Sequence, residues 1–170
     1  MKPRQQRDVF DAWLREHAAI LHHVANGFAS GADRHDLMQE LMLALWRAVP
    51  AFRAESRAST FIFRVTHNAA LTWKRAEKSH QRKLDAWQQL DAGLAPTADD
   101  PAAGQASQLE LLYAAIRELE PLDRSLVLLQ LDEASYEQIA EIHGLSESNV
   151  GVRLNRIRHK LTTLIQEKTS

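Results

Sequence analysis

The chain has 170 residues, enough for one generous domain or two small ones, and its 45% hydrophobic and 25% charged residues are typical of a folded protein. It contains no cysteine, which excludes disulfides, thiolate metal sites and cysteine nucleophiles. The first residues lack an apolar signal-type segment and no apolar run approaches the length of a membrane span, so we expect a protein of the cytoplasm.

The net charge of −1 conceals a strong segregation of charges along the chain. Residues 53–83 carry eight basic and two acidic side chains, and residues 149–170 carry five basic and one acidic. The segment between them is acidic, most strongly over residues 109–148, with nine acidic and two basic side chains. A charge run by itself is more commonly a solvated face, but two basic patches beside motifs predict two contacts with a polyanion.

Apolar residues recur at helical spacing throughout the chain, and no stretch alternates with a period of two for long. We therefore predict an all-α protein. The first helix is expected to end near Ala29, and the second to run from a cap at Asp33 to Pro50. The third is expected to begin at a cap on Ser59 or Thr60 and to continue into the basic stretch "KRAEKSHQRK".

The helical periodicity is lost over residues 85–107, where Pro, Gly, Ala and Asp accumulate. This composition predicts a flexible acidic linker. The expected organisation is therefore two small helical domains, residues 1–84 and residues 108–170, joined by that linker.

A helix-turn-helix is predicted in the second domain, in "SYEQIAEIHGLSESNVGVRLNRIRHKL". Ser135 and Gln138 have the spacing of a capping box, Gly144 lies where a left-handed residue ends the first helix, and Ser146 can cap the next one. The motif also has the spacing that lets two helices cross closely: a small residue at Ala140, a turn glycine at Gly144 and a β-branched residue at Val150.

The second helix of this motif is basic on its outward side. The N-terminal half of such a helix enters the DNA major groove, where Asn can pair with adenine, Arg with guanine and valine methyls can meet a thymine methyl. A hairpin that serves only as a core or as a protein-binding face remains the alternative. The candidate DNA-binding residues of this helix are Asn149, Gly151, Val152, Arg153, Asn155 and Arg156.

No constellation typical of an enzyme occurs in the sequence: there is no Gly-rich phosphate loop, no zinc-protease motif and no nucleophile beside a placed base. The histidines at positions 17, 22, 23 and 35 are not spaced to present two ligands on one helical face. We therefore expect a protein that is not an enzyme and that uses neither a cofactor nor a metal ion.

Two stretches resemble a known family. "DLMQELMLALWRAVPAF" followed by "STFIFRVTHNAALTWKR" resembles region 2 of a bacterial sigma factor, and "IRELEPLDRSLVLLQLDEASYEQIAEIHGLSESNVGVRLNRIRHKL" resembles region 4. Two such regions in this order, with a short connection, are the layout of the extracytoplasmic-function group of the sigma-70 family. The resemblance implies a sigma factor that directs core RNA polymerase to promoters and assists promoter opening.

The resemblance also assigns roles to residues of the first domain. It implies that region 2 docks on the β′ clamp helices of the polymerase and region 4 on the β flap. It also implies that the candidate DNA-binding residues of the helix-turn-helix are −35 DNA-binding residues. The docking positions share one helical face by their spacing: Asp36, Gln39, Glu40 and Leu43. The candidates for capturing the −10 strand supply cations, an amide and an aromatic ring: Phe52, Arg53, Arg57, Arg64, Asn68, Lys74, Arg75 and Lys78.

Two other functions stay open at the level of the sequence. A stand-alone helix-turn-helix regulator would need the second domain alone, and a protein-binding adaptor would need neither basic patch. The resemblance further implies a partner in trans, an anti-sigma factor, that holds the protein inactive.

Overall fold

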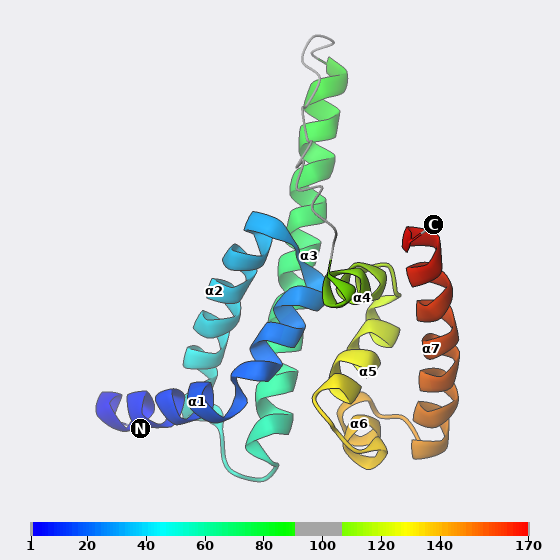
Figure 1. The fold of residues 1–170 in the computed structure, drawn as a ribbon. Helices are drawn as coiled ribbons and strands as arrows, with labels where there is room; N and C mark the ends of the chain where they lie inside the picture. Colours follow the sequence, from blue (N-terminus) through cyan, green and yellow to red (C-terminus); the bar gives the residue numbers. More distant parts are fainter. Residues whose placement is uncertain (1, 91–106, 170) are drawn as a thin grey trace.

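The computed structural model describes residues 2–90 and 107–169, and every regular element in these two ranges is helical. A front domain contains α1 (Pro3–Phe28), α2 (Gly31–Ala48), the short 3-10 turn η1 (Val49–Ala51) and α3 (Ala58–Leu90). A rear domain contains α4 (Gln108–Arg117), α5 (Pro121–Leu131), α6 (Tyr136–His143) and α7 (Glu147–Thr169) (Figure 1). The predicted all-α class is confirmed.

The front domain is built around α2, whose apolar stripe is completely buried between α1 and α3. Leu37, Leu41 and Leu45 are each 0% exposed, as the four-residue spacing requires of one helical face. α1 is kinked at His17, where the backbone leaves the helical region. α3 is much longer than its partners and projects beyond them (Figure 1).

The rear domain is specified by its helix caps. The Ser135 hydroxyl accepts a hydrogen bond from the Gln138 backbone N–H, and the Gln138 side chain accepts one from the Ser135 N–H. Gly144 follows with φ +64°, a conformation that costs glycine nothing. The Ser146 hydroxyl then accepts from the Asn149 N–H at 3.2 Å, so all three predicted features of the helix-turn-helix are confirmed.

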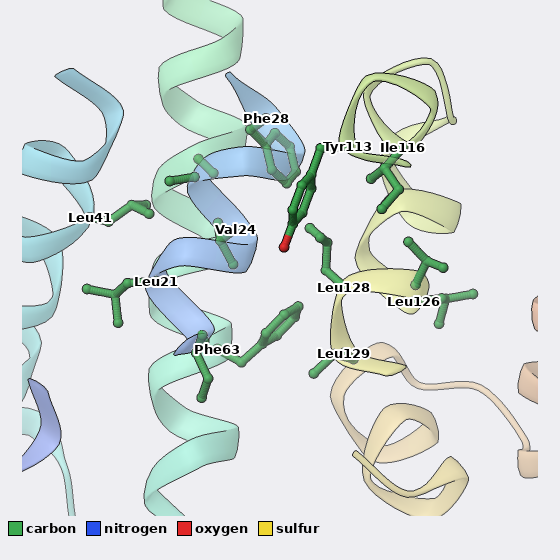
Figure 2. Close-up of a cluster of buried hydrophobic side chains, with 14 of the residues drawn as sticks. Leu21, Val24, Phe28, Leu41, Phe63, Tyr113, Ile116, Leu126, Leu128 and Leu129 are labelled. Atoms are coloured by element: carbon green, nitrogen blue, oxygen red, sulfur yellow. The ribbon is translucent and has the colours of Figure 1, made fainter. Parts of the chain in front are cut away.

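The two domains pack against each other, with α1 and α3 of the front domain touching α4, α5 and α6 of the rear domain. Figure 2 shows Val24 and Phe28 of α1 facing Leu128 and Leu129 of α5 across this junction. Gly27 marks the closest approach, since a Cβ at this position would lie 2.8 Å from the Leu128 methyl carbons.

The boundaries of several elements differ from the sequence prediction. α2 begins at Gly31, so Asp33 lies in its first turn rather than at its cap, and α3 begins at Ala58, just before both proposed caps. α3 also continues to Leu90, which makes residues 85–90 part of the helix although the sequence placed them in the linker. The remainder of the predicted linker, residues 91–106, lies outside the described residues. In the described ranges, no helix combines the length and the apolarity needed to span a membrane.

Candidate nucleic-acid interface

The predicted docking face is exposed along the outer side of α2. Asp36, Gln39 and Glu40 are all exposed, and Leu43 at the end of the row is 45% exposed. The buried leucines on the opposite side of the helix hold this face in place, so its geometry is fixed by the core. A large apolar side chain left in water beside three polar ones is the composition of a protein contact surface.

Asn68 lies in a groove between α2 and α3 that we call the capture groove. The groove has a volume of about 510 Å³ and its lining includes Glu40, Arg47, Asn68, Thr72 and Trp73. The Asn68 side chain is exposed, while the Trp73 ring is half-buried on the same helix. An amide and an indole lining one groove offer hydrogen bonding and stacking to an unpaired base.

The predicted cations of the front domain lie in the loop before α3 and along α3 itself. Five of the six are exposed: Arg53, Arg57, Arg64, Arg75 and Lys78. Lys74 is half-buried; its ammonium lies 2.6 Å from the Glu77 carboxylate and 5.9 Å from the centre of the Trp73 ring. Lys74 is therefore already engaged, which leaves the five arginine and lysine side chains around it as the freer cations of this surface.

Phe52 has a packing role in the structure. Its ring lies 5.2 Å from that of Trp13, edge to face, and 5.1 Å from that of Phe61. Edge-to-face pairs of this kind add to the stability of a core. The half-buried Phe52 thus ties the start of the loop to α1 and α3.

The outward side of α7 presents most of the predicted −35 residues. Val150, Leu154 and Ile157 are buried at 0–1% exposure and fix the rotation of the helix. Asn149, Asn155 and Arg156 are exposed, and Val152 is 68% exposed. The candidate residues that lie at this surface are thus brought together on one face.

Gly151 and Arg153 are placed differently from the rest of the set. A Cβ at Gly151 would lie 3.3 Å from the Tyr136 ring, so this glycine lets α6 approach α7 closely. The Arg153 guanidinium donates a hydrogen bond to Asp123 at 3.1 Å, and Arg156 lies 4.0 Å from the other oxygen of the same carboxylate.

Asp123 is a residue that the sequence analysis missed. It lies in the first turn of α5, thirty residues from Arg153 in the chain, and only the fold brings the two together. Trp73 packs against the core and also lines the capture groove. Its spacing from Asn68 gave no signal of this, because residues five apart on a helix do not share a face.

In the described residues, no group of three or more His, Asp or Glu side chains is placed to hold a metal ion.

Comparison with protein families identifies both domains. Residues 9–80 match the model of Sigma-70 region 2, and residues 109–161 match that of Sigma-70 region 4. Together the two matches cover well over half of the chain, in the order predicted from the sequence. The chain belongs to the sigma-70 family of RNA polymerase sigma factors, in its extracytoplasmic-function (ECF) group. Members of this family direct core RNA polymerase to promoters.

Relatives from distant bacteria resemble the chain over nearly its whole length. It is 28% identical to "ECF RNA polymerase sigma factor SigM" of Mycobacterium tuberculosis over 165 residues, which are 94% of this chain and 78% of the relative. It is 27% identical to "RNA polymerase sigma factor CarQ" of Myxococcus xanthus, covering 95% and 91%. For "RNA polymerase sigma factor YlaC" of Bacillus subtilis the identity is 29%, covering 93% and 92%.

Two solved structures share the fold. The sigma factor RpoE of Bartonella quintana, in complex with the anti-sigma factor NepR, superimposes with a TM-score of 0.62 at 21% identity and covers 94% of this chain and 98% of that one. CnrH, in complex with the cytosolic domain of CnrY, gives a TM-score of 0.62 at 20% identity, covering 95% and 90%.

Proposed function

We propose that this sigma factor divides promoter recognition between its two domains. The rear domain reads the −35 element as duplex through the outward face of α7. The front domain binds core polymerase through α2 and holds the −10 strand in the capture groove. The observation that carries this proposal is that the exposed basic side chains of the two domains lie on different helices, α3 and α7, while the exposed docking face lies on α2.

Strand opening without an energy source occurs only if binding of the opened strand offsets its free-energy cost. The capture groove supports the front-domain role because it offers such a binding site. Unstacking a base costs a few kcal/mol, and hydrogen bonds, stacking and phosphate contacts offset that cost. Asn68 supplies the amide and Trp73 the ring, while Arg64 and Arg75 lie exposed on the same helix to meet phosphates.

The docking face supports binding to the β′ clamp helices, with Leu43 as its apolar anchor and the three polar residues as its rim. The second polymerase contact, between the rear domain and the β flap, rests on the family resemblance. An anti-sigma factor is a further proposed partner, since both structural relatives were solved as complexes, the first of them with a protein named as an anti-sigma factor.

The experiment that tests the function is run-off transcription from a bacterial genomic library with sigma-free core polymerase, with and without the protein. New discrete start sites that share a two-part upstream motif are expected. If no new starts appear and the protein does not bind core in a pull-down, the sigma-factor role is refuted and the stand-alone regulator takes its place.

A matched pair of leucine variants separates polymerase docking from folding. Leu43→Ala removes the proposed anchor and should weaken core binding by about tenfold, which is roughly 1.4 kcal/mol at an interface. Leu109→Ala removes an equally large side chain that is 59% exposed on α4, and should leave core binding unchanged. Equal affinities of the two variants for core would contradict the docking assignment.

A further inference from the structure

A buried histidine lies at the junction of the two domains. His67 of α3 is 8% exposed, and its ring stacks on Phe63 at 5.5 Å and meets the Phe28 ring of α1 edge-on at the same distance. From the rear domain, the His143 ring of α6 approaches it edge-on with the ring centres 6.0 Å apart. His143 in turn shares a hydrogen bond of 2.8 Å with the Ser125 hydroxyl of α5.

The second imidazole and the arginine near His67 would oppose a positive charge on its ring, whereas the face of the stacked Phe63 ring would favour one. α1 contributes Phe28, α3 contributes Phe63 and the exposed Arg64, and α6 contributes a second imidazole. α5 contributes Arg124, whose guanidinium lies 4.8 Å over the Phe28 ring. The Nδ1 atom of His67 is buried without a hydrogen-bond partner among the described residues.

Burial, the neighbouring His143 and the charge of Arg124 lower the pKa of His67 from 6.5 to about 4. Burial also lowers the pKa of His143. Both rings are therefore neutral in the packed arrangement at neutral pH, and protonation of either works against that arrangement.

We propose that the contact between His67 and His143 is a proton-sensitive latch, which holds the two domains together while both rings are neutral and releases them when the rings are protonated. Separation removes His143 and Arg124 from the neighbourhood of His67 and lets water reach its ring, which relieves the cost of the charge. In the packed arrangement the buried side chains of both domains form one continuous core, with Leu41 and Ile62 on the front side of the junction and Leu154 and Ile157 on the rear side.

The direction of the pH effect follows from proton affinity. The separated state binds the proton more tightly than the packed state, so acidification below pH 6.5 favours separation, and the effect saturates near pH 4. From these limits, His67 alone shifts the packing equilibrium by up to about tenfold between neutral pH and pH 5.5.

A second histidine contributes to the same junction. His23 of α1 lies with its Nδ1 2.7 Å from the Asp132 carboxylate of the rear domain. This hydrogen bond joins α1 to the rear domain independently of the contact between His67 and His143.

The latch has a consequence that rests on the proposed function. Arg64 and Asn68 line a pocket of about 360 Å³ together with His67, Leu122 and His143. The rear domain thus borders the strand-capturing residues when the domains are packed, and its release opens access to them from that side.

The latch itself is tested without polymerase or DNA, by the distance between the domains. The cysteine-free chain allows a donor and an acceptor dye to be placed at Gln5→Cys on α1 and Thr163→Cys on α7, both exposed positions. Energy transfer is followed from pH 7.5 to pH 5 at constant ionic strength, with far-UV circular dichroism to show that the helices persist. We expect the transfer efficiency to fall as the pH falls.

Variants identify the side chains that cause the pH response. His143→Gln keeps an amide for Ser125 but cannot be protonated, and His67→Phe fills the stacked position with a neutral ring; each should flatten the pH response. His22→Gln changes an exposed histidine of α1 and should leave the response intact. Gly27→Ala weakens the packing at Leu128 and brings the equilibrium into a measurable range if the native chain is almost fully packed.

Two results would overturn the proposal. One is a distance that does not change with pH in the native chain and in Gly27→Ala. The other is a pH response that is the same in His67→Phe and His143→Gln as in the native chain. Neither result bears on transcription, so the latch and the sigma-factor function can fail separately.

Discussion

The two basic surfaces of the molecule differ in how firmly their cations are held. On the rear domain, Asp123 binds Arg153 and lies near Arg156, and α7 is fixed by a fully buried row behind it. On the front domain, Arg53, Arg64 and Arg75 are exposed in the loop before α3 and on α3. A prearranged surface suits a duplex, whose phosphates have fixed positions, whereas exposed side chains suit a single strand, whose phosphates do not.

The largest expected effect is a loss of stability when the core beneath the basic surface of the rear domain is disrupted. Leu154→Ala empties a fully buried site under α7 and should lower the free energy of unfolding of the rear domain by about 2–5 kcal/mol. Val152→Ala, on the exposed side of the same helix, should change it by less than about 0.5 kcal/mol. Denaturant unfolding followed by circular dichroism measures both, and similar losses would refute the assignment of the two faces.

The next effect tests the reading of duplex DNA. Arg156→Ala should weaken binding to the −35 duplex by about 1–3 kcal/mol, since it removes the exposed guanidinium of the recognition face. Arg158→Ala removes an exposed arginine just outside the predicted set and serves as the control. Titration of labelled duplex, once the start-site experiment has given the promoter, compares them; equal losses would mean that only the overall charge matters.

A smaller effect is expected from substitutions in the turns that precede the two basic surfaces. Gly144 and Ala54 both have positive φ, at 64° and 58°. Gly144→Ala meets no atom within 4 Å, so its cost is backbone strain alone, about 1 kcal/mol in unfolding free energy. Ala54→Gly should be close to neutral, because the relieved strain is offset by the freedom that glycine gains in the unfolded chain. Thermal unfolding of the two variants should show this difference.

The smallest expected effect concerns how firmly Asp123 holds Arg153 on the rear domain. Asp123→Asn releases Arg153 from its ion pair, so this arginine becomes free to contact phosphate as the front-domain arginines are. The plot of log affinity for duplex against log salt concentration should steepen by about one unit. An unchanged slope would show that the pairing with Asp123 does not restrain Arg153.

The parts of the fold that were predictable are those specified by nearby residues. The capping box of Ser135 and Gln138, the left-handed Gly144 and the buried stripe of α2 all depend on contacts within a few positions of the chain. The last turns of α3 were not predicted, although Leu84, Trp87 and Leu90 recur at helical spacing, because the linker composition that follows them was extended back over residues 85–90.

The candidate site was predictable to the same extent. The exposed faces of α2 and α7 follow from spacing on a single helix, and the residues expected there lie on them except for the half-buried Gly151 and Arg153. The contacts between distant segments did not follow, because nothing local marks them. Three pairs show this: Asp123 with Arg153, His23 with Asp132, and His67 with His143. The members of each pair are 30 to 109 positions apart in the chain, and only the tertiary structure brings them together.

The most direct test of the divided recognition is to measure promoter binding and strand opening on the same polymerase assembled with Asn68→Ala. Binding to the closed promoter should match that of the native protein, while opening, followed by the fluorescence of a base analogue in the −10 element, should be strongly reduced. Gln81→Ala, an exposed amide on the same helix, should open the promoter normally. A loss of closed-promoter binding as large as the loss of opening would contradict the account.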